Sequence, residues 1–443
     1  MKRRDFLKAT SIVSTGMFLG ASSISAKSYA NIYGANERLN FAVVGVRSRA
    51  HAHREAIKYC ENAIISHICE VDKRYEADFS NKVKEQFGTA PKSVKDFRKL
   101  VEEKDIDVIT IATPEHWHAP MSIMALQNGK HVYVEKPCAH NPREGELLVL
   151  AQKRYDKLIQ MGNQQRSSKH TIEIVNRIKD GLIGTPYYGK AWYNNKRQGI
   201  GVGKVVPVPN YLDWELWQGP APRTAYRDNV HPYNWHWFWR WGTGETLNNG
   251  THEVDVCRWA LGLDYPDRVT ANGGRYHYND DWEFYDTLNT SFEYDDGKMI
   301  TWEGKSCNGL TDYNRGRGSL IQGTNGSVLV DRGGYIVYNL GGEIIEEYDP
   351  MKDAASATSD LVGMDNMTID HFRNLCNGIR NGEKLRSPIN EGNISVTMLL
   401  LSNIAWKYNR VLNLDSKTGR IENDSEAMSM WSREYEPGWE PKV

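Results

Sequence analysis

Two polar clusters contain residues whose chemistry could move a proton. In the first, Glu135-Lys136-Pro137, the proline restricts Lys136 to extended backbone conformations. A lysine fixed in this way could bind a reacting hydroxyl and stabilise the alkoxide that develops from it; the alternative is a surface lysine at a strand end. In the second cluster, His252 and Asp255 stand three residues apart at an expected helix start, so they share one face.

The elements around Lys136 predict a βαβ unit. Residues 108–112 are apolar and predict a strand that is buried on both faces. A helix is expected over 120–128 and a second strand over 131–134, which together imply a parallel sheet. Ligands of such sheets bind beyond the carboxyl ends of the strands. Both 113–116, Thr-Pro-Glu-His, and 135–137 fall at that edge.

An earlier segment, 39–69, predicts a strand, a turn that begins at Gly45, a helix and a second strand. This is how a dinucleotide-binding fold begins. Of the pattern G-x-G-x-x-G the chain keeps Gly45, with Arg47 and Ala50 at the other two places. Alanine is tolerated at the third place. Arg47 is a departure, because a side chain there crowds the approach of the backbone to a pyrophosphate.

Glu70 follows the second strand of this segment. A carboxylate there can accept hydrogen bonds from the adenosine ribose hydroxyls and would repel a 2′-phosphate. The sequence therefore favours NAD over NADP, although the nearby Arg74 weakens that preference a little.

The stretch 107–138 resembles the Gfo/Idh/MocA family, the relatives of glucose–fructose oxidoreductase and inositol dehydrogenase. The resemblance lies in a T-P-x-x-x-H turn followed, one strand later, by E-K-P. Residues 212–222, 323–331 and 433–439 look like segments that are common in exported bacterial members. The resemblance implies an α/β fold class, with an N-terminal Rossmann domain and a C-terminal α+β domain that contains an open, largely antiparallel sheet.

We expect a twin-arginine signal peptide over 1–30, an NAD-binding Rossmann domain over 36–162, a substrate-binding domain over 163–410, and a tail over 411–443 that packs on the body. Further helices are expected at 53–59, 142–155, 367–381 and 394–408, and strands at 63–69, 158–162, 187–193, 267–278, 286–294, 299–305, 319–324 and 327–331.

The resemblance also implies site residues. It places a catalytic histidine at His252 and a carboxylate four residues earlier, where this chain has Asn248. An amide can hold substrate or orient the imidazole, but it cannot stabilise an imidazolium as a carboxylate does. We assign His252 as general base and Asp255 as the residue that orients it; the alternative is a histidine that caps or packs a helix. Cofactor contacts are expected from Gly45, Arg47, Ser48, Glu70, Thr113, Pro114, His118, Glu135, Lys136 and Asn163.

Tryptophans are concentrated in the segment that precedes Asn248 and His252: seven of the 14 lie between Trp192 and Trp241. Some of them must pack in the core. The flat face of an indole also suits the C–H face of a sugar ring, so Trp235, with His236 and Arg240 as polar neighbours, is a candidate wall of a carbohydrate site.

The composition of the chain indicates which kinds of partner and site are not expected. At 443 residues the chain is long enough for two domains. The net charge of −1 argues against nucleic acid. The mean hydropathy is −0.61, and no apolar run after the N-terminus reaches the roughly 20 residues of a membrane helix, so no membrane anchor is expected. Six cysteines without close Cys/His spacing predict no metal site. We expect a homo-oligomer, a dimer or a tetramer.

The N-terminus predicts export. Arg3-Arg4 with Phe6-Leu7 matches the twin-arginine pattern, a mildly apolar segment follows over 9–24, and Ala30 offers a cleavage site. The protein is then expected in the periplasm, or otherwise outside the inner membrane. The alternative is a basic, disordered N-terminus.

We therefore predict an NAD-dependent oxidoreductase that transfers a hydride between a hydroxyl carbon of a sugar, glycoside or cyclitol and a tightly bound cofactor. An NAD-dependent glycoside hydrolase that oxidises C3 transiently and eliminates the aglycone is the alternative, and a non-catalytic sugar-sensing subunit is a third. Lys136, together with the loss of a carboxylate at Asn248, favours the first.

Overall fold

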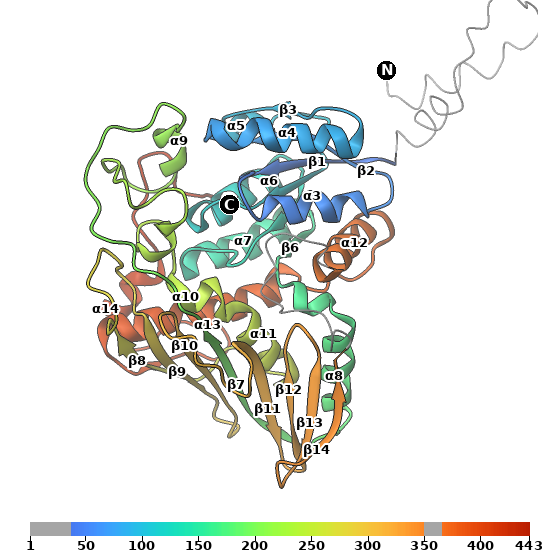
Figure 1. Cartoon of the computed structure of the whole chain (residues 1–443), viewed down its shortest axis with the longest axis vertical. Coiled ribbons are helices and arrows are strands. Elements are labelled where there is room, and N and C mark those ends of the chain that lie inside the picture. Colours follow the sequence, from blue (N-terminus) through green and yellow to red (C-terminus); the bar gives the residue numbers. More distant parts are fainter. Residues whose placement is uncertain (1–36, 350–365) are drawn as a thin grey trace, which may run out of the picture. The chain divides into compact units, whose positions relative to one another are not determined.

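A six-stranded parallel sheet occupies the first half of the chain in the computed structural model, which describes residues 37–349 and 366–443 (Figure 1). The strands lie in the order β3-β2-β1-β4-β5-β6, and every neighbouring pair is parallel. Their bounds are β1 Leu39–Val44, β2 Ala63–Cys69, β3 Lys92–Ser93, β4 Val108–Ile111, β5 His131–Val134 and β6 Ile159–Met161. The βαβ arrangement predicted around Lys136 is confirmed.

Helices connect these strands, and α4, α5 and α7 begin at side-chain caps. The Asp72 side chain caps α4 by accepting from the Arg74 N–H, and Gly88 ends the same helix in the left-handed region. Asn141 caps α7, with Pro142 as the first helical residue. The helices are α3 Ala50–Lys58, α4 Lys73–Phe87, α5 Phe97–Leu100, η1 Glu115–Trp117, α6 His118–Gln127 and α7 Pro142–Tyr155.

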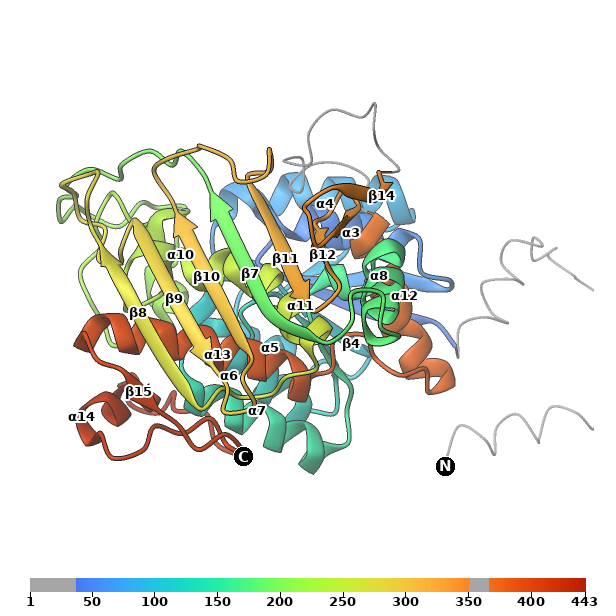
Figure 2. The same ribbon diagram turned by 90° about the horizontal axis from the view of Figure 1, so that it is seen from below.

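The second sheet has nine strands in the order β14-β13-β12-β11-β7-β10-β9-β8-β15. It is antiparallel except for the β7–β10 pair. Buried residues alternate along β9 and β10 because one face packs on α11 and α13 (Figure 2). The strands are β7 Pro186–Asn194, β8 Arg268–Gly274, β9 Thr287–Glu293, β10 Met299–Lys305, β11 Arg317–Gly323, β12 Gly326–Val330, β13 Tyr335–Asn339, β14 Ile344–Tyr348 and β15 Leu412–Asn413.

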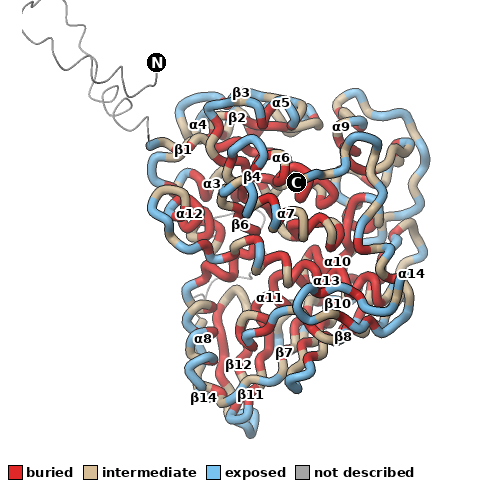
Figure 3. Tube along the Cα trace, turned by 180° about the vertical axis from the view of Figure 1, so that it is seen from behind, coloured by how far each residue is buried: buried red, intermediate tan, exposed pale blue. Residues whose placement is uncertain are grey.

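The remaining helices all follow β6 in the sequence. They are η2 Gln164–Ser167, α8 Lys169–Lys179, α9 Trp214–Gln218, η3 Asn234–Trp237, α10 Gly244–Asn248, α11 Gly250–Leu261, α12 Asn366–Asn381, α13 Ile389–Tyr408, α14 Ser425–Met428 and η4 Ser429–Trp431. The buried trace runs through α10, α11 and α13 (Figure 3). Although α12 lies late in the sequence, it packs on the first sheet, where Phe372 stacks on Tyr133 with ring centroids 4.2 Å apart.

One long connection, residues 208–241, reaches from the second sheet back to the first, and we call it the strap; it includes α9 (green in Figure 1). The N–H of Asp213 donates to the Val71 oxygen over 3.0 Å, and the N–H of Lys73 donates to the Tyr211 oxygen over 2.9 Å. The Arg74 guanidinium lies 3.8 Å from the centroid of the Tyr211 ring. The strap is therefore fixed beside the carboxyl end of β2.

The C-terminal segment fastens the strap and η1 together. Arg433 donates to the His116 oxygen over 2.6 Å and pairs with the buried carboxylate of Glu144. The N–H of Glu436 donates to the oxygen of Pro220 in the strap over 3.1 Å. Residues 433–436 thus brace the turn that follows β4.

The predicted fold class is confirmed: a parallel Rossmann sheet is followed by an open, mostly antiparallel sheet. The expected signal peptide, 1–30, lies outside the described residues. Within 37–349 and 366–443, no helix is long and apolar enough to cross a membrane. All six cysteines are free thiols.

Candidate active site

A single cleft extends from the carboxyl edge of the parallel sheet to the second sheet, with a cavity volume of about 1600 Å³. This exceeds the roughly 300–1,000 Å³ of a pocket for one small ligand, so there is room for a cofactor and a substrate together. The Rossmann side contributes Gly45, Glu70, Thr113 and Lys136, and the α11 side contributes His252.

Gly45 is required at the first turn of the cleft. Its φ is +77°, and a Cβ there would lie 2.8 Å from the Ala112 oxygen, so other residues would strain or clash. Arg47 does not fill the turn. Its guanidinium extends toward the strap, 5.8 Å from the centroid of the Tyr75 ring and within 3.5 Å of the Pro232 oxygen. The glycine turn, with Ser48 beside it in the cleft lining, therefore leaves space for a pyrophosphate despite the arginine.

Glu70 lies in the cleft directly after β2, the position that contacts the adenosine ribose in dinucleotide-binding folds. Its carboxylate accepts from the backbone N–H groups of Val46, Val71 and Asp72 at 2.7–2.9 Å. Burial raises the pKa of Glu70, and these three donors oppose that rise. Arg74 is held by the Asp72 carboxylate through bonds of 2.6–3.2 Å, so its charge is compensated.

His118 connects the two sequence motifs. One ring nitrogen lies 2.9 Å from the Thr113 oxygen, next to Pro114, and the other lies 2.6 Å from the Pro137 oxygen. Burial lowers the pKa of His118, and a neutral ring donates to one carbonyl at a time. The predicted cofactor contact therefore also fixes the turn after β4 against the turn after β5.

Glu135 lines the cleft, but its carboxylate is bound by protein groups. Its carboxylate binds the Arg49 guanidinium and the His53 ring at 2.9 Å each, and it accepts from Gln164 at 3.1 Å. Arg49 and His53 hold the pKa of Glu135 well below its usual range despite burial. It anchors the beginning of α3 to the E-K-P turn.

Lys136 projects into the cleft from the end of β5. Its ammonium donates to the backbone oxygen of Asn248 and, over 3.4 Å, to the Asn248 side-chain oxygen. Burial lowers the pKa of Lys136 to about 8, while the charges of Glu135 and Glu115 oppose this. A lysine with such a pKa is close to the protonation balance that acid–base catalysis at neutral pH requires.

His252 lines the same cleft from the first turn of α11 and is 5% exposed. Its Nδ1 is buried and has no hydrogen-bond partner within residues 37–349 and 366–443. Burial and the cations Arg332, Lys136 and Arg317 hold the pKa of His252 well below its usual value. The ring is therefore neutral, and it is a weak base.

The expectation that Asp255 orients His252 is wrong. The carboxylate of Asp255 binds the Arg166 guanidinium over 2.7 and 2.9 Å and accepts from the Ser395 hydroxyl over 2.7 Å. Although the two positions are one helical turn apart, the Asp255 carboxylate lies against η2 and α13, where a buried arginine binds it.

Two carboxylates that sequence reasoning missed lie close to Lys136. Glu245, on α10, pairs with Arg197 and lies 3.4 Å from the Asn248 amide nitrogen. Glu115, in the turn after β4, lines the cleft, is 2% exposed and accepts from the Thr243 hydroxyl over 2.5 Å. Burial raises the pKa of Glu115 to about 7, although Thr243 and Lys136 oppose the rise. Its place within Thr-Pro-Glu-His, at the carboxyl end of a strand, was the signal available in the sequence.

The tryptophan-rich segment 235–241 has some side chains in the cleft and others in the core. Trp235 and His236 stack with ring centroids 3.6 Å apart, and both line the cleft. Trp237 instead stacks on Trp282 in the core. The prediction that Arg240 helps to form a wall of the carbohydrate site is wrong. Its side chain is exposed and donates to the Pro222 oxygen over 3.1 Å, because η3 ends before it and the chain turns outward.

Asn163, another expected cofactor contact, is buried beside Gln164 and Gln165, which line the cleft. Neither its amide oxygen nor its amide nitrogen has a partner among the residues that the structure describes.

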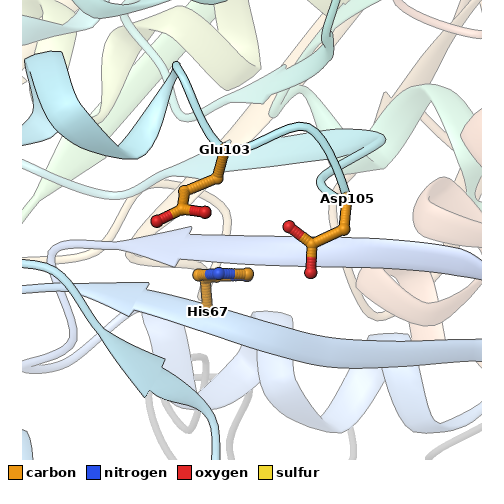
Figure 4. A group of neighbouring side chains, drawn as sticks. All are labelled: His67, Glu103 and Asp105. Atoms are coloured by element: carbon orange, nitrogen blue, oxygen red, sulfur yellow. The ribbon is translucent and has the colours of Figure 1, made fainter.

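A cluster with metal-ligand chemistry lies elsewhere, at His67, Glu103 and Asp105 (Figure 4). Glu103 and Asp105 precede β4, so they lie at the amino edge of the sheet rather than at the cleft. Glu103 already pairs with Lys92, and Ser66 lies 2.9 Å from the His67 ring. The cluster contributes nothing to the candidate site.

Two family models match the chain. The one described as an oxidoreductase family with an NAD-binding Rossmann fold matches residues 39–163, and the one described as the GFO/IDH/MocA C-terminal domain matches residues 221–329. An α-N-acetylgalactosaminidase from Shewanella oneidensis is 28% identical over 209 residues, which are 43% of this chain and 45% of that protein. The match thus spans less than half the length of this curated relative.

Solved structures with the same fold cover most of the chain. The WlbA dehydrogenase from Bordetella pertussis, in complex with NADH and UDP-GlcNAcA, has a TM-score of 0.61 and 18% identity, over 85% of this chain and 99% of that chain. A levoglucosan dehydrogenase, in complex with NADH and levoglucosan, has a TM-score of 0.63 and 18% identity, with the same coverage.

Proposed function

Because the chain belongs to the Gfo/Idh/MocA family of NAD-binding enzymes, we propose that it oxidises or reduces a hydroxyl-bearing carbon of a sugar, glycoside or cyclitol. The observation that carries this proposal is Lys136, whose ammonium projects into a cleft that also contains the Gly45 turn and Glu70. NAD fits that end of the cleft because Gly45, Ser48 and Glu70 line it together, while the Arg47 guanidinium extends toward the strap. When bound, NAD supplies the acceptor or donor of a hydride.

The residues of the chain bind and orient the reacting oxygen. Lys136, as an ammonium, would hold the hydroxyl oxygen and stabilise the charge that develops on it. His252, as a neutral ring in the same cleft, would position that hydroxyl. Trp235 and His236 would form one side of the sugar site, because their stacked rings line the cleft. Asn248 would keep Lys136 aimed into the cleft rather than bind substrate.

We also propose that the protein is exported with NAD already bound. The twin-arginine pattern supports export, and the strap supports retention of the cofactor. Leu216, Trp217 and His231 of the strap line the same cleft as Glu70 and Asp72, so they cover the adenosine end. Denaturing protein purified from the periplasm and assaying the supernatant would test this, with about one NAD per chain expected. No cofactor before and no uptake after adding NAD would contradict it.

A second candidate function is redox-neutral glycoside cleavage. It is favoured by the α-N-acetylgalactosaminidase among the relatives. It is also favoured by Glu115. This carboxylate lines the same cleft as Asn248, which stands where the family is expected to have a carboxylate. Elimination requires an acid–base group besides the one that serves oxidation, and the cleft offers Glu115 and Lys136 for these two roles.

One experiment separates the two candidates. The NAD-loaded protein is mixed with a panel of free sugars, glycosides and cyclitols, and both the absorbance of reduced nicotinamide and the released aglycone are followed. We expect one reduction per site, then a stall that an added keto-sugar relieves. Sustained release of aglycone without any acceptor would establish the hydrolase instead. Neither signal across the panel, with Lys136→Met as the blank, would contradict both.

A further inference from the structure

Glu115 has the geometry of a reacting group rather than of a structural one. It is buried, it lines the cleft, and its carboxylate accepts a hydrogen bond from the Thr243 hydroxyl. The other buried carboxylates near Lys136 are committed to cations: Glu135 binds Arg49 and His53, and Glu245 binds Arg197. Glu115 has no such cationic partner in the part of the chain that the structure describes, and it shares the cleft with Lys136.

The short helix α10 fixes Glu115 and Lys136 relative to each other. Thr243, which precedes the helix, donates to Glu115, and Asn248, at the end of the helix, accepts from Lys136. Thr243 is held in turn, because its backbone oxygen accepts from Asn403 over 2.8 Å. Two charges that come from different strands are therefore positioned by one five-residue element.

We propose that Glu115 is the catalytic base of this site, and that it takes the proton of the substrate hydroxyl while the Lys136 ammonium holds the same oxygen. This rests on the proposed function and replaces His252 in the role of base. In the oxidation, the O–H bond breaks and its proton goes to the Glu115 carboxylate. The C–H bond breaks and its hydrogen leaves with the electron pair for the nicotinamide of NAD, and a C=O bond forms. Reduction of a ketone reverses each step.

The electrostatics agree with this assignment. A base works best when its pKa is close to the working pH. The pKa of Glu115 is about 7, whereas burial and nearby cations hold the pKa of His252 well below its usual value. The charged groups that face Glu115 are Lys136 and Glu245. The charged groups that face Lys136 are Glu115, Glu135, Arg317 and Arg332, and the neutral, titratable rings of His118, His236 and His252 also face it.

The test is the pH profile of kcat/KM in the direction of oxidation. Because the base must be ionised and the lysine protonated, the profile rises through about pH 7 and falls through about pH 8. Glu115→Gln keeps the size of the side chain and an acceptor for Thr243. We expect it to lower turnover by about 10²–10⁴-fold and to abolish the rise near pH 7. The fall should move to lower pH, because the charge of Glu115 no longer raises the pKa of Lys136.

Two matched variants make the test specific. Thr243→Val removes a donor that lowers the pKa of Glu115, so the rising limb should move to higher pH while full turnover returns above it. His252→Gln should keep the rising limb. A rise that persists in Glu115→Gln and disappears in His252→Gln would overturn the proposal and restore His252 as base.

Folding and function are controlled separately. Bound NAD and thermal unfolding are measured for every variant. If Glu115→Gln fails to fold, Thr243→Val tests the proposal instead, through the direction in which the rising limb of its pH profile moves. An unmoved limb in that variant would contradict the proposal. If none of the sugars makes the wild-type protein reduce its NAD, the proposed function fails. If a sugar does so and Glu115→Gln keeps the wild-type turnover and pH profile, this inference alone fails.

Discussion

Asp255 and Arg166 form a buried ion pair through two hydrogen bonds of 2.7 and 2.9 Å, with Arg166 contributed by η2 and Asp255 by α11. The pair joins the segment that leaves the parallel sheet to a helix that packs on the second sheet. It therefore holds the two halves of the cleft together from behind the site.

Asp255→Asn should reduce stability rather than alter proton transfer. Removing one partner of a buried pair leaves the other charge uncompensated, which typically costs about 3–5 kcal/mol. Urea unfolding measures this cost, and Ser395→Ala, which removes one neutral donor to the same carboxylate, should lose about 1 kcal/mol. A stable Asp255→Asn protein whose pH profile of turnover has shifted would show that Asp255 acts on His252 after all.

Glu70→Ala should weaken NAD binding by roughly 2–4 kcal/mol, because two hydrogen bonds to a charged group are lost. NADP binding should fall less, since the carboxylate that repels a 2′-phosphate is also removed. Calorimetric titration of cofactor-free protein with each dinucleotide measures both. Arg74→Ala is the control, and because Asp72 already holds this guanidinium it should leave the NAD/NADP ratio nearly unchanged. Equal losses for both cofactors in Glu70→Ala would place the ribose elsewhere.

Lys136→Ala should bind NAD normally and lose about 10²–10⁴-fold in turnover, since the ammonium acts on the reacting oxygen. A small primary amine in the buffer should restore part of the rate, with a pH dependence set by the amine's own pKa. Lys130→Ala is the matched control. That buried lysine donates to the Glu103 and Ile106 oxygens, away from the cleft, so its loss should affect stability and not turnover. Wild-type turnover in Lys136→Ala would contradict any role for this lysine in the chemistry.

Glu135 should make the protein sensitive to acid. Its folded-state pKa is depressed by Arg49 and His53, so its contribution to stability is present above the unfolded-state pKa of about 4.3. That contribution is lost as the pH falls from about 5 toward the depressed folded-state value. The free energy of unfolding in urea should therefore drop between about pH 5 and pH 3. Glu135→Gln should start less stable and show a smaller drop; an equal drop in both proteins would assign the acid sensitivity to other groups.

Local patterns were sufficient for much of the fold. The predicted bounds of β5, α7 and β10 are those observed. The apolar runs, the helix caps and the alternation of buried and exposed residues that predict them all lie within each segment. The site was harder, because its contacts join distant segments. Thr243 lies 128 residues from Glu115, and Arg166 lies 89 residues from Asp255. No spacing rule within α11 or within the turn after β4 contains those partners.

The strands β13 and β14 and the role of α12 were missed for a related reason. Spacing indicated a helix over 367–381, but its partner is the first sheet, through Phe372 and Tyr133. Arg240 failed as a wall residue because η3 ends three residues before it, and that ending is set by packing rather than by a sequence signal.

Arg433 is synthesised long after the turn that it braces. His116 and Arg433 are 317 residues apart, and ribosomes add about 5–20 residues per second. Roughly 15–60 s therefore pass between the synthesis of the turn that carries Glu115 and the synthesis of the arginine that braces it. The strap is made within the same interval. All six strands of the parallel sheet are made before the strap, so a sheet that folds during synthesis would offer its nucleotide site to NAD before the strap covers it and before Arg433 braces the turn.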